Sequence, residues 1–411
     1  MKQFLRLFIL ALVRILGAPR VFIASRRVRN VPANPRILLI RPDHLGDLVL
    51  TTPVLDALKS RLPNAHITMM VGSWSSEVVA RHPAIDRLIT CAFPGFRRAA
   101  QGPLAPYVLL FQTARQLRRQ HYDIAINLRP DFWWGAALLY LAAIPYRVGY
   151  AIAPGTPFLN HAISFHASEH ATVSNLRLIS TTLQLSSTQP LSEPYTPERY
   201  PLVFEPTSEE DEWVTRRLYE NDIDEHASII VIHPGTGAAV KLWRNEAWAT
   251  CANRLLSAQS TPTHVILTGS PAERTMLTAI ADEMHTKPLI VADATIGQLA
   301  ALMRRATLVL GTDTGPLHLA VAQHTPTVTI FGPTDPRIFG PWGDGTQHIV
   351  VASTHRCPTC PVIPCGRLDF SSEELPAHPC TRLVSEQEVE QAALHLLDMA
   401  SIMGYKKSQE I

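Results

Sequence analysis

Residues 37–58 read ILLIRPDHLGDLVLTTPVLDAL, and this stretch decides how the rest of the chain folds. An apolar run typical of a buried parallel strand ends in a polar turn, and a helical pattern follows the turn. That order is typical of a nucleotide-binding unit, but the turn holds a single glycine instead of G-x-G-x-x-G. It carries the pair Gly46–Asp47. An acidic group here would repel a phosphate, so the role of Asp47 needs another explanation.

Strand and helix patterns alternate onward from this unit in two sets. The first set predicts strands at 36–40, 65–71 and 122–128 and helices at 49–61, 75–81 and 131–143. The second predicts strands at 227–235, 263–269, 288–292, 306–313 and 325–333, and helices at 246–257, 272–284, 296–304 and 316–323. Alternation of this kind indicates α/β domains built from parallel βαβ units.

Length and composition fit two domains. The chain has 411 residues, 46% of them hydrophobic, and its formal net charge of +2 gives no reason to expect a nucleic-acid partner. A polar, proline-containing segment at about 186–211 separates the two sets. We expect Rossmann-like domains over 36–190 and 205–345, then a cysteine-containing tail and helix over 346–400. Ligands of such sheets bind outside the carboxyl ends of the strands, so the loops there should carry the chemistry.

Residues 1–30 form a separate basic segment with no acidic residue. Its longest uncharged apolar run, Leu7–Val13, is too short to span a bilayer, and Arg14 interrupts the apolar region that a signal peptide would need. We predict an amphipathic helix that lies in a membrane interface with its cations toward anionic headgroups. A helix packed on the protein's own surface is the alternative.

The stretch VLGTDTGPLHLA, residues 309–320, predicts an anion site in the second domain. A strand and a sharp turn lead into a helix whose first N–H groups have no partner within the helix. Thr314 adds a hydroxyl, and Gly315 allows a ligand to approach closely. Asp313 belongs to this site, serves as the helix N-cap, or does both.

Residues 232–248, IHPGTGAAVKLWRNEAW, supply a cation for the same edge of the sheet. Gly235 and Gly237 leave the backbone exposed, and Thr236 offers a hydroxyl. Lys241 suits a diphosphate leaving group, because it would neutralise the charge that develops there. Glu273, in the first turn of a later helix, either holds ribose hydroxyls or only favours the helix N-terminus.

Asp47 has two interpretations in the first domain. It is a helix N-cap, since the apolar helix positions begin at Leu48, or it is a general base that orients and deprotonates a hydroxyl. His44 competes for the role of base. We favour Asp47.

Four of the six cysteines cluster in the tail, as CPTCPVIPC at 357–365 (Cys357, Cys360 and Cys365) and as Cys380. One C-x-x-C pair with two further thiols fits a structural Zn²⁺ site, but the spacing is irregular, so we predict no metal. Without an export signal the compartment is expected to be reducing, which disfavours disulfides.

Three stretches together resemble glycosyltransferase family 9, the lipopolysaccharide ADP-heptose transferases. They are RPDHLGDLVLTTPVLDALKSRLPNAHITMMV, HPGTGAAVKLWRNEAW and GTDTGPLHLAVAQHTPTVTIFGPTDP, and the similarity runs from about Arg36 to about Leu397. The resemblance implies a GT-B fold, with two Rossmann-like domains that face each other across a cleft. The acceptor belongs to the first domain and the nucleotide sugar to the second, and a last helix crosses back toward the first.

The resemblance also implies roles for single residues. Asp47 matches the catalytic base, Thr236, Gly237 and Lys241 match the loop that contacts the donor diphosphate, and Glu273 matches a ribose-binding acid. Asp313, Thr314, Gly315 and His318 match the D-T-G-x-x-H loop at the donor. For the acceptor the candidates are Arg41, His44, Arg97 and Arg98; the last two either meet acceptor phosphates or carboxylates or are solvated.

The implied reaction moves a heptose from ADP-heptose to a lipid-linked lipopolysaccharide inner-core acceptor, with inversion, without a metal and without a cofactor. The enzyme is then peripheral on the cytoplasmic face of the inner membrane. One alternative is a GT-B transferase that uses another nucleotide sugar for a surface polysaccharide. A non-catalytic nucleotide-binding scaffold is the other, although a scaffold has no need of Asp47, Lys241 and Asp313 together.

Overall fold

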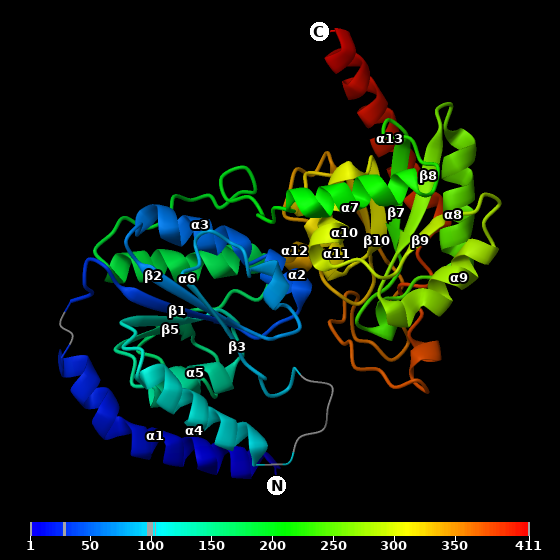
Figure 1. Cartoon of the computed structure of the whole chain (residues 1–411). Helices are drawn as coiled ribbons and strands as arrows, with labels where there is room; N and C mark the ends of the chain where they lie inside the picture. Colours follow the sequence, from blue (N-terminus) through cyan, green and yellow to red (C-terminus); the bar gives the residue numbers. More distant parts are fainter. Residues whose placement is uncertain (1, 28–29, 97–101, 103, 410–411) are drawn as a thin grey trace. The chain divides into compact units, whose positions relative to one another are not determined.

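The computed structural model describes residues 2–27, 30–96, 102 and 104–409. The chain divides into two compact units, Met1–Thr196 and Pro197–Ile411, and the described residues of each are built on a six-stranded sheet (Figure 1). All strand pairs in both sheets are parallel. The predicted pair of open parallel sheets is therefore confirmed.

The sheet of the first unit has the strand order β3-β2-β1-β4-β5-β6. Its strands are β1 (Arg36–Arg41), β2 (His66–Val71), β3 (Arg87–Thr90), β4 (Ile124–Asn127), β5 (Tyr146–Tyr150) and β6 (His161–Ile163). Its helices are α1 (Lys2–Arg27), α2 (Leu45–Val49), α3 (Thr52–Arg61), α4 (Ala105–Arg118), α5 (Trp133–Leu141) and α6 (Ala171–Leu185), with short turns η1 (Ser76–Val78) and η2 (Thr156–Phe158). The chain order reverses between β1 and β4, which makes their carboxyl ends the expected binding edge.

The sheet of the second unit has the order β12-β11-β10-β7-β8-β9, so its reversal lies between β7 and β10. Its strands are β7 (Ser228–His233), β8 (Thr263–Thr268), β9 (Leu289–Val291), β10 (Leu308–Thr312), β11 (Thr327–Phe331) and β12 (His348–Ala352). Its helical elements are α7 (Ser208–Tyr219), η3 (Ala239–Lys241), α8 (Asn245–Ala258), η4 (Pro271–Glu273), α9 (Arg274–Asp282), α10 (Ile296–Arg305), α11 (Gly315–Ala322), α12 (Pro336–Phe339), η5 (Leu375–Ala377) and α13 (Glu386–Gln409).

The helix predicted over 49–61 is wrong in one respect, because the structure divides it into α2 and α3 at Leu50 and Thr51. The Thr51 hydroxyl donates to the Asp47 carbonyl oxygen at 2.6 Å, and Pro53 stands in the first turn of α3. Local hydroxyl bonds compete with the helical ladder, and proline favours the start of a helix, so the sequence begins a second helix here.

Helix α1 packs on the first unit through α5 (Figure 1). Leu10 and Val13 are buried in the same core as Trp134 and Leu138 of α5. The Tyr140 hydroxyl donates to the Arg14 carbonyl oxygen at 2.9 Å. Packing on the protein's own surface, the alternative considered for residues 1–30, therefore does occur along one face of this helix.

Helix α13 packs on α8 and on strands β10, β11 and β12 within the second unit. Val389, Ala393 and Leu396 on its inner face are buried in the core of that unit. That the helix crosses back to the first domain stays a prediction. Over the described residues, none of the helices has both the length and the apolar character that a membrane span needs.

Candidate functional site

Charged side chains gather where the first sheet reverses, at the carboxyl ends of β1 and β4. Arg41 Nε lies 2.7 Å from Asp43 Oδ2, and Arg41 Nη2 lies 3.1 Å from Asp47 Oδ1. Arg129, which follows β4, forms an ion pair with the other Asp43 oxygen. Two carboxylates and two guanidinium groups thus form one network, in which Asp47 is the outermost carboxylate of the β1 loop.

Arg41 is buried, with 4% of its surface exposed. Its Nη1 donates to the Leu128 carbonyl oxygen at 3.1 Å and to Asn175 Oδ1 at 3.2 Å. With these four partners, Arg41 cannot turn toward a ligand without breaking its ion pairs with Asp43 and Asp47 and its two hydrogen bonds. Arg41 therefore fixes the position of the Asp47 carboxylate. This role differs from the direct contact with the acceptor that the resemblance implied for Arg41.

The Asp47 carboxylate combines partial exposure with an unusual pKa. Its side chain is 31% exposed, so an incoming hydroxyl can reach it. Desolvation raises its pKa from 3.8 to about 6, the charge of Asp43 adds to this rise, and Arg41 and Arg129 oppose it. A carboxylate with a pKa near the operating pH is suited to accept a proton as a general base.

The N-cap interpretation of Asp47 is wrong. Helix α2 begins at Leu45, and His44 takes the N-cap position with extended backbone (φ −88°, ψ −177°). Asp47 stands within the first helical turn, where a negative charge also interacts favourably with the helix dipole. The helix begins earlier than its apolar pattern indicates, because Leu45 and Gly46 continue the turn into helical geometry.

His44 is exposed and lies beside two aromatic rings. Its ring centroid is 6.1 Å from that of Trp74 and 6.3 Å from that of Phe96. The Arg129 guanidinium lies 5.1 Å from the Phe96 centroid. His44, Trp74 and Phe96 thus form an aromatic surface next to the charged network. The predicted acceptor residues Arg97 and Arg98 lie outside the described residues.

The second unit places its predicted cation at the corresponding reversal point. Lys241 Nζ lies 3.0 Å from Asp313 Oδ2, although the two residues are 72 positions apart in the sequence. The Thr334 hydroxyl donates to the same oxygen at 2.6 Å. Both partners of the ion pair are largely buried, with side-chain exposures of 14% and 8%. The Lys241 ammonium is therefore fixed at the carboxyl end of β10.

Asp313 is not the N-cap of α11, so that interpretation is also wrong. Thr314 occupies the cap position with extended backbone, and in the described structure no side chain caps this end. Asp313 lies one residue earlier, and its carboxylate is used by Lys241 and Thr334 instead. His318 is buried on α11 and lines a narrow hollow with Asp313 and Thr314.

The remaining predicted donor residues lie around the loop after β7. The Thr236 hydroxyl oxygen is buried and has no hydrogen-bond partner within the described part of the chain, while Gly237 is exposed. A buried hydroxyl without a partner is costly, which suits a position that a ligand completes. A Cβ on Gly235 would lie 2.1 Å from Glu273 Oε1, so a larger residue there would require the Glu273 carboxylate to move.

Glu273 itself helps to begin a helix. Its Oε2 accepts hydrogen bonds from the Ser270 backbone N–H and the Ser270 hydroxyl, both at 2.7 Å, in a capping box. Glu273 thus favours the helix N-terminus through Oε2, while Oε1 lies against the Gly235 loop.

Burial lowers the pKa of nearby His233 to about 4, although Glu273 opposes this shift. The His233 imidazole is therefore neutral at pH 7.

Sequence reasoning missed Asp43, Arg129 and Thr334. All three follow the carboxyl end of a strand: β1, β4 and β11. The rule that ligands bind at these ends would have identified them as candidates. Their partners could not be read from the sequence, because Arg129 and Asp43 are 86 positions apart and meet only where β1 pairs with β4.

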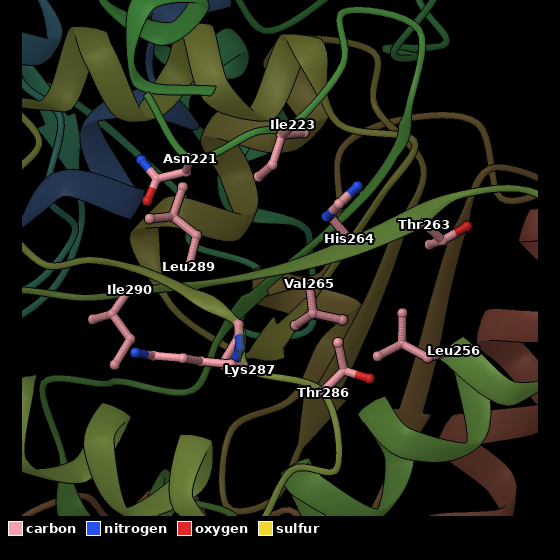
Figure 2. Close-up of a pocket in the computed structure, with 11 residues that line it drawn as sticks. Asn221, Ile223, Leu256, Thr263, His264, Val265, Thr286, Lys287, Leu289 and Ile290 are labelled. Atoms are coloured by element: carbon pink, nitrogen blue, oxygen red, sulfur yellow. The ribbon is translucent and has the colours of Figure 1, made fainter. Parts of the chain in front are cut away.

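A hollow of about 400 Å³ in the second unit lies at the opposite edge of the sheet (Figure 2). Thr263 and Leu289, which line it, are the first residues of β8 and β9. Two of its lining residues, His264 and Lys287, have titratable side chains. Its place at the amino ends of the strands separates it from Lys241 and Asp313, so we do not assign the donor to it.

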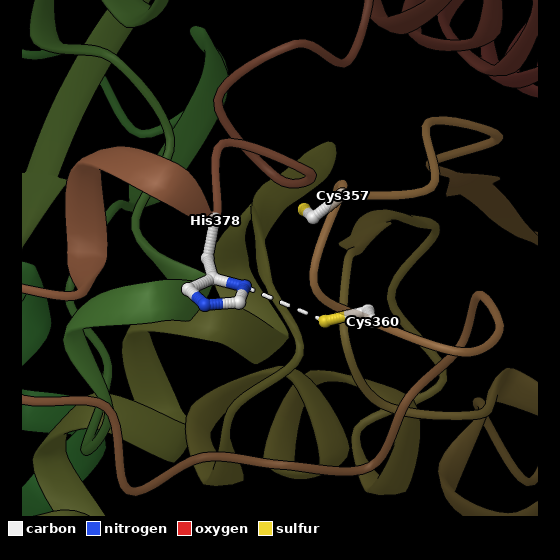
Figure 3. A group of neighbouring side chains, drawn as sticks. All are labelled: Cys357, Cys360 and His378. Atoms are coloured by element: carbon white, nitrogen blue, oxygen red, sulfur yellow. Dashed lines mark hydrogen bonds between the residues drawn. The ribbon is translucent and has the colours of Figure 1, made fainter.

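The tail cysteines come together, and His378 joins them (Figure 3). Cys357, Cys360 and His378 each offer an atom that could bind a metal, and these atoms lie within 4.8 Å of one another. Cys365 lies close enough to Cys360, and Cys357 close enough to Cys380, to raise the pKa of that neighbour. Burial and the neighbouring thiols raise the pKa of both Cys360 and Cys380 to about 11. His378 was not among the predicted residues.

Two parallel-sheet domains in tandem, each with polar groups at the reversal point of its sheet, match the GT-B class of glycosyltransferases. A family model described as glycosyltransferase family 9 (heptosyltransferase) matches residues 110–365. The chain belongs to this family, which confirms the resemblance seen in the sequence and the prediction of a heptosyl-transferring enzyme. Among curated relatives, it is 25% identical to lipopolysaccharide heptosyltransferase 3 of Escherichia coli, over 76% of this chain and 87% of that protein.

Solved structures show the same fold. A glycosyltransferase family 9 protein from Veillonella parvula aligns with a TM-score of 0.70 at 24% identity, over 90% of this chain and 99% of that one. Heptosyltransferase II of Escherichia coli aligns with a TM-score of 0.66 at 19% identity, over 89% and 99%. The Escherichia coli heptosyltransferase WaaC, solved with ADP and with ADP-2-deoxy-2-fluoro heptose, aligns at TM-scores of 0.60 and 0.57 and at 21% and 22% identity, over 77% and 79% of this chain and 93% of that chain in each case.

The charged network predicts how Asp43 controls Asp47. We expect Asp43→Asn to lower the pKa of Asp47 from about 6 toward 3.8, because a neighbouring negative charge is removed and Arg41 and Arg129 are released to Asp47. Carbon-13 NMR titration of the aspartate carboxyl groups measures the shift. Asp56→Asn, on the exposed face of α3, is the matched control and should leave this pKa in place. An unchanged or higher pKa in Asp43→Asn would contradict the electrostatic account.

Proposed function

We propose that the chain transfers a heptose from ADP-heptose to a hydroxyl of a lipid-linked lipopolysaccharide inner-core acceptor. The transfer inverts the anomeric carbon and uses no metal ion at the reacting atoms. One observation carries this proposal: Asp47 is a reachable carboxylate whose pKa is raised to about 6 and whose orientation is fixed by Arg41. A fixed base of this kind supports a single displacement, in which a deprotonated hydroxyl attacks the sugar directly.

On the acceptor side, Asp47 takes the proton of the attacking hydroxyl. Arg41 orients the carboxylate through its bond to Oδ1. Desolvation and Asp43 keep that carboxylate basic enough to accept a proton near neutral pH. The exposed His44 and the aromatic rings of Trp74 and Phe96 beside it offer a surface for the acceptor sugar.

On the donor side, Lys241 and the start of α11 receive the negative charge of the leaving diphosphate. Asp313 and Thr334 hold the ammonium in place before the donor arrives. A preorganised cation beside a helix N-terminus stabilises charge that develops in the transition state without having to move at that moment. In this proposal the Thr236 hydroxyl, which is buried without a hydrogen-bond partner in the described part of the chain, donates to a phosphate oxygen.

The identity of the donor is supported by relatives. WaaC binds ADP and ADP-2-deoxy-2-fluoro heptose. Lipopolysaccharide heptosyltransferases are also the curated proteins that align over about three quarters of this chain. We extend the nucleotide and the sugar from these proteins to this chain.

We also propose that α1 holds the enzyme on an anionic membrane, at the inner face of the cytoplasmic membrane where its acceptor is made. The outer face of α1 is apolar: Leu12, Ile15, Leu16, Phe22 and Ile23 are 41–67% exposed. Leu104, Val108 and Phe111, at the start of and along α4, are exposed as well. The two helices lie near each other: after burial, the charge of Arg20 on α1 is the next cause that lowers the pKa of Arg118 on α4. Exposed Arg14, Arg20 and Arg26 supply the cations that anionic headgroups attract.

The base assignment predicts the effect of Asp47→Asn. We expect kcat to fall by about 10²–10⁴-fold, because a general base typically contributes that much, while ADP affinity stays unchanged. In the wild type, kcat/KM should fall as the pH drops below about 6, since protonated Asp47 cannot accept a proton. Release of ADP from ADP-heptose in the presence of acceptor measures both. Near-normal turnover in Asp47→Asn, with Asp56→Asn as control, would show that another group is the base.

The donor assignment predicts a different result for Lys241→Ala. Loss of one charge-assisted contact should weaken ADP binding about 10- to 100-fold by calorimetry. Lys287→Ala, in the hollow at the amino ends of β8 and β9, removes an equal charge from the same unit and should bind ADP normally. Equal ADP affinity in the two variants would contradict the role of Lys241.

The membrane assignment predicts that Ile15→Asp combined with Ile23→Asp lowers binding to phosphatidylglycerol vesicles without lowering Tm, since both side chains are exposed. Cosedimentation measures binding, and neutral phosphatidylcholine vesicles should bind the wild type less. Tyr219→Asp, which replaces an 82% exposed ring on α7, is the matched control and should bind vesicles normally. Undiminished vesicle binding by the α1 variant would refute the proposal.

A further inference from the structure

The segment between β12 and α13, residues 353–385, has unusually little regular structure for its length. In the described structure its helical content is the short turn η5. Connections longer than about 12–15 residues without secondary structure are uncommon in compact domains, and those that occur are usually functional or disordered. The small apolar cluster beneath it has three buried members, Val240, Cys357 and Cys380. Apolar packing of this size is a weak reason for a long irregular segment to be ordered.

Four thiols and one imidazole converge within this segment. The backbone N–H of Cys360 donates to the Cys357 carbonyl oxygen at 3.0 Å, so the C-x-x-C pair forms a tight turn that points both thiols the same way. Cys360 Sγ lies 3.4 Å from His378 Nδ1 (Figure 3). Cys357, His378 and Cys380 are buried, with exposures of 2%, 6% and 2%. All of these cysteines are unbridged.

We propose that this cluster binds a zinc-class divalent cation in a structural site. Cys357, Cys360 and His378 supply three ligands, and the adjoining thiol of Cys365 or Cys380 supplies the fourth. Three thiolates with one imidazole form a ligand set of tetrahedral structural Zn²⁺ sites, and soft thiolates disfavour Mg²⁺ and Ca²⁺. The prediction of no metal from the irregular cysteine spacing left out His378, which the fold brings to the C-x-x-C turn.

The site has an entry path and support behind its ligands. Cys360, Cys365 and His378 line a hollow of about 290 Å³, through which an ion can reach the thiols. The Phe370 ring lies 3.8 Å from the His378 ring, and the Thr359 hydroxyl lies 3.3 Å from His378 Nε2. These contacts fix the imidazole so that Nδ1 faces Cys360. Groups that orient a metal-binding histidine are a regular part of metal sites.

The proposed site is attached to the donor loop. The Thr381 hydroxyl, next to Cys380, donates to the Val240 carbonyl oxygen at 2.8 Å, and Val240 precedes Lys241. Val240 also packs against Cys357 and Cys380. The cation therefore holds the cysteine segment against the loop that presents Lys241 to the diphosphate. This second step rests on the proposed function; metal binding itself does not.

Metal content tests the site directly. The full chain, expressed with added zinc and purified through a tag that contains no histidine, should carry about one Zn²⁺ per molecule by mass spectrometry of the elements. Cys357→Ser, Cys360→Ser and His378→Ala should lose the metal, and one of Cys365→Ser and Cys380→Ser should lose it as well. Cys91→Ser, a buried free thiol in the first unit, is the matched control and should keep it.

If a ligand variant fails to fold, an experiment on the wild-type chain still tests the site. Removing the metal with a chelator and adding Co²⁺ should give the visible absorption of a tetrahedral thiolate site. A metal-free wild type that also shows no such absorption would overturn the proposal. Protection of the four tail thiols as disulfides in freshly purified chain would overturn it too, as would equal metal content in Cys357→Ser and Cys91→Ser.

The coupling to the donor loop has its own measurement. Chelated wild type should bind ADP about tenfold more weakly than the zinc-loaded chain, because a displaced Lys241 loses a charge-assisted contact, and added Zn²⁺ should restore the affinity. Lys241→Ala should keep its metal. If zinc is present but ADP binds in neither state, the proposed donor is wrong and the metal site stands. Equal ADP affinity with and without zinc would refute the coupling alone.

Discussion

The first domain depends on one buried cation, Arg41. A guanidinium without water must be paired and hydrogen-bonded, and here Asp43, Asp47, Asn175 and the Leu128 carbonyl oxygen together meet that requirement. These partners come from the loop after β1, from α2, from the residue after β4 and from α6. The cation therefore joins the elements on both sides of the reversal point, and Asp47 is oriented as a consequence of satisfying a buried charge.

Arg41 has two opposed effects on Asp47: it orients the carboxylate, and it lowers the pKa of the carboxylate. Arg41 must lie close enough to fix the carboxylate, yet a nearby cation lowers a carboxyl pKa and weakens the base. Desolvation and the charge of Asp43 raise the pKa. Their combined effect is larger than that of the cations, so the pKa of Asp47 lies at about 6 instead of 3.8. Asp43 is thus more than a partner of Arg41 and Arg129. It offsets the effect that the orienting cation would otherwise have on basicity.

Local patterns predicted eight of the twelve strands that the structure describes, missed β3, β5, β6 and β12, and predicted the contacts poorly. Buried apolar runs such as ILLI and IIVI become β1 and β7, since a strand between two helical layers must be apolar on both faces. Asp47 and Asp313 were both read as possible N-caps because a cap depends on where the helix begins, to within one or two residues. The pair Lys241–Asp313 and the approach of His378 to Cys360 depend on sheet order and on an irregular segment. Neither leaves a periodic signal in the sequence.

In the proposed function, the turn at Gly46–Asp47 lacks phosphate-binding glycines because the second domain binds the phosphates and the first binds the acceptor. In the second domain the reversal point presents the Lys241 ammonium held by Asp313, the Thr236 hydroxyl, which has no partner among the described residues, and a helix start. All three favour a negatively charged ligand. In the first domain Arg41 and Arg129 form ion pairs with Asp43 and Asp47, and the exposed member of this network on the β1 side is the carboxylate of Asp47. Such an edge repels a diphosphate and accepts a hydroxyl. The proposed difference between the donor domain and the acceptor domain therefore lies in which charged group each reversal point presents to a ligand: Lys241 and a helix start in the second domain, and Asp47 in the first.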